Sequence, residues 1–461
     1  ELLSKKRCKI TNLLCSFHTI YRHFFNKSVR FILGIKFVYI YLVFYKFHML
    51  KHLYIPFIFL ISFTGFSQVE EVEPDDLIKT ITFKSNTNQS ELPILTLNER
   101  LYLEFDVLSP DEDDYYYVIE HYNYDWTKSN LMKSEYLKGL DNLRIVNYEN
   151  SFNTYQIYSN YRLQIPNKQT RLKVTGNYLI KVFDEEDEIV FSRKFMVYEN
   201  LANVGIQLKR SRDVRDVNTK QSVDFVINTT NFNFNNPKQT VNTVILQNNN
   251  LKTAISGLKP QYILGNELIY RYTTESSFWG GNEYLYFETK DVRGTNLGVQ
   301  FTDLEDLYHS FLYLDSNRYN RGYTYNPDIN GNFQITILDR DNPSIEADYT
   351  VVHFSLLNPE LSNESIYVYG SYNNYALNAS NKMVFNPDSG VYEINIKLKQ
   401  GFYNYKYVLV NSKGELEEGV ISGDFYETEN NYKVLVYYRD LGARYDRIVG
   451  FGEGSSTQIG N

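Results

Sequence analysis

The stretch SSFWGGNE, from Ser276 to Glu283, sets a Gly-Gly pair beside a tryptophan and a carboxylate. A phosphate-binding loop needs such glycines to lead into a helix N-terminus with a lysine behind it. Here the next residues are YLYFETK, which alternate between aromatic and strand-forming types. The sequence therefore predicts a turn or bulge at which glycine takes a positive φ and the aromatic rings pack on a sheet. We take six residues as a structural signature, not a reactive loop: Phe278, Trp279, Gly280, Gly281, Asn282 and Glu283.

Other catalytic or metal-binding patterns are sparse. Beyond residue 67 the chain has three histidines, His121, His309 and His353, far apart in sequence and outside any His-Glu-x-x-His pattern. Each is predicted to be a strand or surface residue and not a metal ligand. No Gly-x-Ser-x-Gly elbow occurs, and both cysteines, Cys8 and Cys15, precede Met49. The sequence predicts no catalytic residue, no cofactor and no metal.

Two acidic runs, Asp111 to Asp114 and Asp184 to Glu188, are the remaining candidates for a cation site. Calcium takes several carboxylates from one loop. The second run, however, separates two strand-like segments as the tip of a charged hairpin would, and acidic loops are commonly solvated. Solvated turns are the preferred interpretation.

The first 67 residues predict export. Residues 1–48 precede the first methionine, Met49, and are interpreted as upstream frame outside the translated protein. Residues 49–67 have a short basic start, an apolar core and small residues before Gln68, as in a secretory signal peptide. The alternative is a pair of transmembrane helices in 31–47 and 53–66, but two lysines interrupt the first run and the second is short for a span.

Composition limits the partners. Residues 1–67 contain ten Lys or Arg and one Asp or Glu, so the rest of the chain has 37 basic and 54 acidic residues and a net charge of −17. Nucleic acid and anionic lipid require basic protein surface, so neither is predicted as the main partner. Without cysteines, the exported chain must be stabilised by its core alone.

The elements that carry these residues are predicted to be β-strands. Strand-like runs separated by turn residues recur from Ile78 to Tyr438, and only Ser129 to Leu137 and Thr302 to Tyr308 look weakly helical. The pattern predicts an all-β protein of tandem immunoglobulin-like β-sandwiches. The predicted modules are 70–200, 201–340 and 341–450, followed by a Gly- and Ser-rich flexible tail, 451–461.

The last module resembles the early-set, immunoglobulin-like glycogen-binding module. The segment VYGSYNNY, from Val368 to Tyr375, precedes GFYNYKY at Gly401 to Tyr407, in the order of that family's turn and strand motifs. The resemblance implies a glycan-binding surface at Tyr372, Asn374 and Tyr375. Tyr375 stands where the family has tryptophan, and a shared fold does not imply a shared function.

A wider resemblance covers about residues 75–450. The order of several segments is similar to the plug subunit of the type IX secretion translocon of Bacteroidota. They are SEYLKGL (134–140), SFNT (151–154), YSNYRL (158–163), GNYLI (176–180), SRKFMV (192–197), WGGNE (279–283), DINGNF (328–333) and IEADY (345–349).

This resemblance implies a non-enzymatic periplasmic protein at the inner face of the outer membrane. Its partner would be the giant outer-membrane β-barrel translocon, which it would close when no cargo is in transit. It would be peripheral to the membrane through protein contacts, without spanning it. The alternatives are a periplasmic or surface glycan-binding protein and, least favoured, a glycan hydrolase, since no carboxylate pair stands out among the 54 acidic residues.

Overall fold

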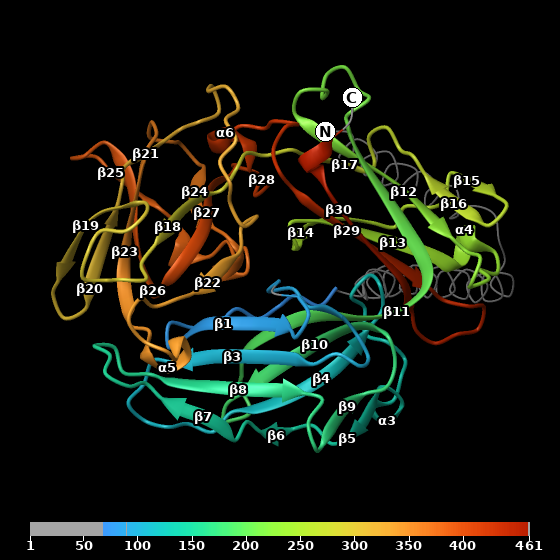
Figure 1. Cartoon of the computed structure of the whole chain (residues 1–461), viewed down its shortest axis with the longest axis horizontal. Coiled ribbons are helices and arrows are strands. Elements are labelled where there is room, and N and C mark those ends of the chain that lie inside the picture. The colour runs from blue at the N-terminus through green and yellow to red at the C-terminus, as the bar shows by residue number, and fades with distance from the viewer. Residues whose placement is uncertain (1–67, 89, 460–461) are drawn as a thin grey trace, which may run out of the picture. The chain divides into compact units, whose positions relative to one another are not determined.

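β-Strands make up most of the regular structure in residues 68–88 and 90–459, the part of the chain that the computed structural model describes (Figure 1). The strands form several open sheets that pack face to face, so the predicted all-β, tandem-sandwich fold is confirmed. The predicted upstream frame and signal peptide lie outside the described residues.

The first sandwich pairs a small sheet with part of a larger one. Alternation of buried and partly exposed residues, as in LYLEFDV of β3, turns one face of each strand to the core. Figure 1 shows β1, β3 and β8 lying across β10 and β4. The small sheet has the order β1 (Ile78–Ser85), β3 (Leu101–Val107), β8 (Ser159–Ile165) and β7 (Asn147–Asn150).

The larger sheet has thirteen strands and is shared between the first and second sandwiches. Its central strand, β11 (Ile189–Arg210), pairs with β10 in its first half and with β12 in its second half. The other members are β2 (Ile94–Thr96), β4 (Tyr116–Tyr122), β6 (Leu143–Arg144), β10 (Gly176–Phe183), β12 (Lys220–Asn228), β13 (Val241–Gln247), β14 (Asn250–Ser256), β15 (Tyr262–Leu264), β16 (Glu267–Tyr270), β17 (Ser277–Trp279), β29 (Asn431–Tyr438) and β30 (Arg447–Ser455).

The last sandwich is built from two sheets that enclose one apolar core. The five-stranded sheet contains β18 (Leu285–Glu288), β22 (Phe333–Ile335), β24 (Ser365–Tyr369), β27 (Gly401–Val410) and β28 (Leu416–Glu417). The six-stranded sheet contains β19 (Val299–Leu304), β20 (Tyr308–Leu312), β21 (Asp315–Ser316), β23 (Tyr349–Leu357), β25 (Val384–Asn386) and β26 (Val391–Lys399).

Helices are single turns in the described residues. The weakly helical 129–137 region contains one of them, whereas 302–308 is wrong as a helix because it joins two strands, β19 and β20. The short elements are α3 (Lys133–Tyr136), α4 (Pro237–Thr240), α5 (Pro343–Glu346), α6 (Gly419–Ser422), η1 (Ser371–Asn373), η2 (Ala379–Asn381) and η3 (Ser456–Gln458); β5 (Leu137–Gly139) and β9 (Thr170–Leu172) form a separate ribbon.

Strand pairing does not follow the order of the predicted modules. β29 pairs with β13, and β30 pairs with β11, so residues from the predicted third module complete the sheet of the second. Residues 451–455, predicted as the start of a flexible tail, lie within β30. Glycine permits this packing: a Cβ at Gly452 would lie 2.7 Å from the Val204 carbonyl oxygen.

A buried ion pair joins the first and last sandwiches. Lys399 Nζ on β26 lies 2.6 Å from Asp106 Oδ2 on β3, and the two side chains are 1% and 0% exposed. Tyr349 donates a 2.6 Å hydrogen bond to the same carboxylate oxygen, and Asn160 donates one of 2.8 Å to the other. The charges are therefore paired and hydrogen-bonded, as burial requires.

Candidate functional site

A cleft of about 800 Å³ between the second and last sandwiches is a candidate site. We call it the Trp279 cleft. One wall comes from β14 and the SFWGG segment; the other comes from β27, β28, α6 and the segments beside them. Its lining consists of Gln247, Lys252, Thr253, Ile255, Ser277, Phe278, Trp279, Gly280, Gly281, Tyr319, Lys406, Leu416, Glu417, Glu418, Gly419, Val420 and Asp424.

Residues 278–281 of the structural signature line one wall of the Trp279 cleft, and residues 282 and 283 attach that wall to neighbouring segments. Trp279 is 54% exposed, whereas Phe278 is 5% exposed and packs against Tyr432 at 5.4 Å between ring centroids. Gly281 has a φ of +65°, the left-handed conformation that favours glycine. A Cβ at Gly280 would lie 2.0 Å from the Phe425 carbonyl oxygen. The glycines thus allow the segment to turn and to lie against the 425–430 segment.

The polar end of the signature is a structural anchor. Asn282 donates a 2.7 Å hydrogen bond to the Ser422 carbonyl oxygen. Glu283, 1% exposed, accepts hydrogen bonds from the Tyr323 hydroxyl and from the Glu429 amide. Burial raises the pKa of Glu283, and these two donors oppose the shift. The carboxylate fixes neighbouring segments and does not line the cleft.

Two charged groups lie deeper in the cleft. Lys406 on β27 is 4% exposed, and its ammonium lies 4.0 Å from the centroid of the Tyr284 ring. Asp424 accepts a 3.1 Å hydrogen bond from the Gly281 amide. Burial raises the pKa of Asp424 to about 6, although the Gly281 amide and Lys406 act in the lowering direction.

The residues expected to form a glycan-type surface lie elsewhere. Tyr375 is 5% exposed and packs edge-on against Tyr369. Tyr372 packs edge-on against Tyr403 at 5.7 Å, and its buried hydroxyl has no hydrogen-bond partner among the described residues. The buried Tyr375 ring offers no free face for stacking on a sugar, whereas Tyr372 is half-buried and lines a separate cleft of about 740 Å³. The early-set resemblance located a turn, and in this protein Tyr375 of that turn packs inward.

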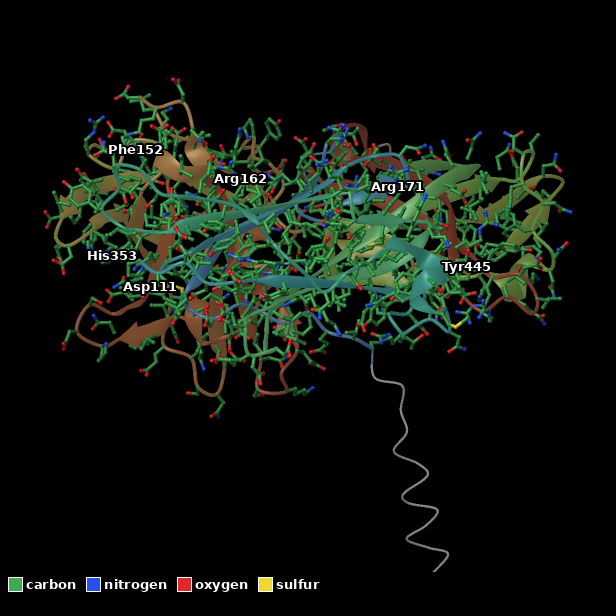
Figure 2. The ribbon with its side chains drawn as sticks, turned by 90° about the horizontal axis from the view of Figure 1, so that it is seen from below. Asp111, Phe152, Arg162, Arg171, His353 and Tyr445 are labelled. Atoms are coloured by element: carbon green, nitrogen blue, oxygen red, sulfur yellow. The ribbon has the colours of Figure 1, made fainter. Side chains whose placement is uncertain are left out.

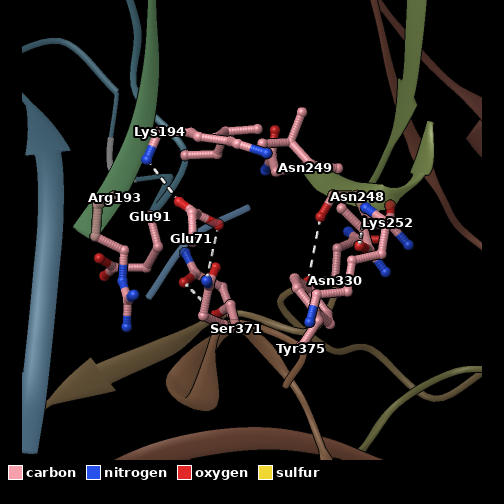
Figure 3. Close-up of a pocket in the computed structure, with 15 residues that line it drawn as sticks. Glu71, Glu91, Arg193, Lys194, Asn248, Asn249, Lys252, Asn330, Ser371 and Tyr375 are labelled. Carbon is pink, nitrogen blue, oxygen red and sulfur yellow. Dashed lines mark hydrogen bonds between the residues drawn. The ribbon is translucent and has the colours of Figure 1, made fainter. Parts of the chain in front are cut away.

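Asn374 belongs to a small polar cavity of about 40 Å³ where segments of all three sandwiches meet (Figure 3). It donates hydrogen bonds of 2.9 and 2.8 Å to Glu71 and Glu73. Glu71 also accepts a hydrogen bond from the Lys194 amide at 2.5 Å, and the Tyr375 hydroxyl donates to the Asn248 carbonyl oxygen at 3.3 Å. A cavity of this size admits water but no sugar. The hydrogen bonds among its lining residues join the three sandwiches.

The histidines and acidic runs form no metal site within the described residues. His121 is buried, and burial lowers its pKa to about 4. His309 and His353 meet on adjacent strands with Nδ1 and Nε2 2.8 Å apart, a contact that their sequence separation concealed. The run from Asp184 to Glu188 connects β10 to β11 as a hairpin tip.

Comparison with known proteins places the chain in a family. Residues 78–199 match the model of the type 9 secretion system plug protein 1st domain. The crystal structure of a hypothetical protein from Parabacteroides merdae ATCC 43184 is similar, with a TM-score of 0.81 and 34% sequence identity over 84% of this chain and 100% of that one. The chain belongs to the type 9 secretion system plug protein family. No curated protein matches it.

Membership in the plug family indicates a plug role in the type 9 secretion system, association with that system, and a structural role in the periplasm. In residues 68–88 and 90–459 of this plug family member, no helix combines the length and apolar character needed to cross a membrane.

The sequence of this plug family member does not predict the part of the Trp279 cleft formed by Lys406, Tyr319 and Asp424. The motif GFYNYKY predicts only that Lys406 lies on a strand, and no motif indicates a role for Tyr319 or Asp424. The available signal was the alternation in GFYNYKYVLV of β27: a lysine flanked by buried tyrosines is a buried charge that needs a reason. The groups around Lys406 come from distant segments, which alternation alone does not reveal.

Proposed function

We propose that this plug family member binds the periplasmic mouth of the outer-membrane β-barrel translocon of the type 9 secretion system and closes it when no cargo is in transit. The observation that carries the proposal is the match of residues 78–199 to the first plug domain. The mechanism is steric: a folded body covers the opening, and no bond is made or broken.

Connections between the sandwiches support this role, because a body that blocks a wide channel must resist bending. The first and second sandwiches share β11, a continuous strand of 22 residues. The first and last are joined by the buried pair of Asp106 and Lys399. Relative motion of the sandwiches would have to break strand pairing or separate buried charges, and both are costly.

The segment 146–157 of the first sandwich is a suitable contact surface. Val146, Phe152, Tyr155 and Ile157 are 75%, 66%, 56% and 56% exposed (Figure 2 labels Phe152). The backbone of this segment is nonetheless fixed, because the Phe152 amide donates to the Ile345 carbonyl oxygen at 2.9 Å and the Tyr155 amide to Asp348 at 2.7 Å. Exposed apolar side chains on a fixed backbone suit reversible protein association.

Site-specific photo-crosslinking tests the proposal. A photoreactive residue at Phe152 should capture one very large outer-membrane barrel protein in cells. The same residue at Val214, which is 87% exposed in the second sandwich, is the matched control for surface accessibility. Capture of the barrel from Phe152 and not from Val214 would support the proposed contact surface.

Deletion tests the closing function separately. Cells that lack the protein should become more permeable to large antibiotics, and the intact chain should restore the barrier. Affinity purification that recovers no outer-membrane barrel, together with an unchanged barrier after deletion, would contradict the proposal.

A further inference from the structure

The Trp279 cleft has the composition of a ligand site and not of a gap between domains. Trp279 and Tyr319, from different segments, are 54% and 55% exposed at its walls. Lys220 lies over the Trp279 ring with Nζ 4.1 Å from the centroid, so a cation on an element outside the lining fixes the indole. Ligand pockets typically combine such aromatic walls with a few fixed polar groups.

Lys406 is the polar group of the cleft that lacks hydrogen-bond acceptors and a counter-ion among the described residues. Its side chain is more than nine-tenths buried and lines the cleft, yet within the described part of the chain its ammonium has no hydrogen bond and no ion pair. The ammonium lies over the face of the Tyr284 ring and beside Gly281, where a Cβ would lie 3.1 Å from Nζ. An ammonium carries three donors, and burial without acceptors is costly, so the donors remain available to a ligand.

The charges around Lys406 select the kind of acceptor. The lining contains two lysines, Lys252 and Lys406, and three carboxylates, Asp424, Glu417 and Glu418. A phosphate or another multiply charged anion would meet this excess of negative charge. Asp424 also has one oxygen, Oδ2, without a hydrogen bond in the described structure, since the Gly281 amide donates to Oδ1. A hydroxyl group fits both sides, because it accepts from an ammonium and donates to a carboxylate.

The backbone of residues 279–281 offers no free edge to a peptide that binds by strand addition. The Trp279 carbonyl oxygen accepts from Gln247 at 2.9 Å, and the Gly280 amide donates to the Thr219 carbonyl oxygen at 2.8 Å. The Gly281 amide and carbonyl are bonded to Asp424 and to the Phe425 amide. An extended peptide requires free backbone groups at a strand edge, and those of residues 279–281 are occupied.

We propose that the Trp279 cleft binds a short neutral saccharide, with Trp279 and Tyr319 against its apolar faces and with Lys406 and Asp424 bonded to its hydroxyl groups. This site is distinct from the early-set surface expected at residues 372–375. It goes beyond the plug role and does not depend on it.

Tryptophan fluorescence provides a direct test, because the chain contains only two tryptophans. Trp126 lies beneath Lys194 in the first sandwich, so Trp126→Phe in the full chain leaves Trp279 as the reporter. The probes are cellobiose, maltose and N,N′-diacetylchitobiose, titrated singly. We expect saturable quenching by at least one disaccharide. Lys406→Met should weaken its binding at least about tenfold, and Trp279→Ala should abolish the binding measured by calorimetry.

Lys433→Met is the matched control, because Lys433 is 6% exposed but does not line the cleft. It should leave the affinity unchanged, and all variants should keep the parent's circular dichroism. The absence of saturable quenching by all three disaccharides would overturn the proposal. So would equal loss of affinity in Lys406→Met and Lys433→Met, or saturable binding of a short peptide that Lys406→Met weakens while no disaccharide binds.

Discussion

Lys399 and Lys406 lie seven positions apart in the last sandwich and have very different surroundings. Both are almost fully buried, and both ammonium groups lie about 4 Å from a tyrosine ring centroid, at 4.1 and 4.0 Å respectively. Lys399 also has the Asp106 carboxylate at 2.6 Å and the Ser344 carbonyl oxygen at 2.7 Å. Lys406 has neither kind of partner in the described structure.

The difference shows that burial alone does not identify a structural lysine. Lys399 has its partners within the protein, so its role is to hold the first and last sandwiches together. Lys406 has a cleft where those partners would be, so its unused donors point to a partner that is not part of the chain. The three predictions that follow test this distinction.

Removing Lys399 should have the largest effect. Lys399→Met leaves the Asp106 carboxylate buried without its counter-ion, and breaking such a pair costs about 3–5 kcal/mol of unfolding free energy. Chemical denaturation followed by tyrosine fluorescence measures the loss.

The double variant Asp106→Asn/Lys399→Met removes both charges and should recover most of that stability. Arg215→Met, which disrupts an exposed ion pair with Asp213, is the surface control and should leave stability nearly unchanged. A double variant as unstable as Lys399→Met would show that the pair's charges are not what holds the sandwiches together.

Lowering the pH should weaken saccharide binding at the cleft. The pKa of Asp424 is about 6, so below that pH the carboxylate becomes protonated and loses acceptor capacity. Affinity should fall about threefold to tenfold between pH 7.5 and pH 5, as measured by calorimetry. The charged groups that act on Asp424 are Lys406, Glu418 and Lys220.

The predicted loss of saccharide affinity at low pH does not come from acid unfolding driven by Asp424. The folded-state pKa of Asp424 lies above the usual aspartate value, so proton uptake near pH 6 favours the folded state at this position. Asp424→Asn should bind more weakly and show a smaller dependence on pH. An unchanged pH profile in Asp424→Asn would remove Asp424 from the site.

Removing Lys406 should have the smallest effect on stability. Lys406→Met exchanges a buried, unpaired ammonium for an apolar side chain of similar length, so relief of the buried charge offsets the lost contact with Tyr284. The unfolding free energy should change by no more than about 1 kcal/mol. A loss as large as that of Lys399→Met would mean that Lys406 is structural, and the distinction between the two lysines would fail.

The sequence predicted the strands better than their arrangement. Alternation of residue types identifies segments such as β1 and β3 as strands, because each has one buried face. The pairing of β13 with β29 joins residues about 190 positions apart, and local patterns carry no information on such distances. The boundaries drawn at 340 and 450 follow the order of the chain, whereas β29 and β30 return to the second sandwich.

The same limit applies to the candidate site. The turn at Gly280 and Gly281 was predictable from the sequence, because the residues YLYFETK after it exclude a helix. The positive φ at Gly281 agrees with that prediction. The exposure of Tyr372 and Tyr375 was not, because a turn motif does not say which way the turn packs. The pairing of Lys399 with Asp106 and the isolation of Lys406 depend on segments far away in sequence.

The late position of β29 and β30 in the chain has a consequence for the timing of folding. Tyr198 of β11 pairs with Ile448, and Val241 of β13 pairs with Tyr438, so the sheet of the second sandwich cannot close until almost the whole chain is present. When the chain is synthesised or transferred with its N-terminus first, β11 and β13 lack their partner strands β30 and β29 for most of that time. That interval is when unpaired strands are most exposed to aggregation and to chaperones.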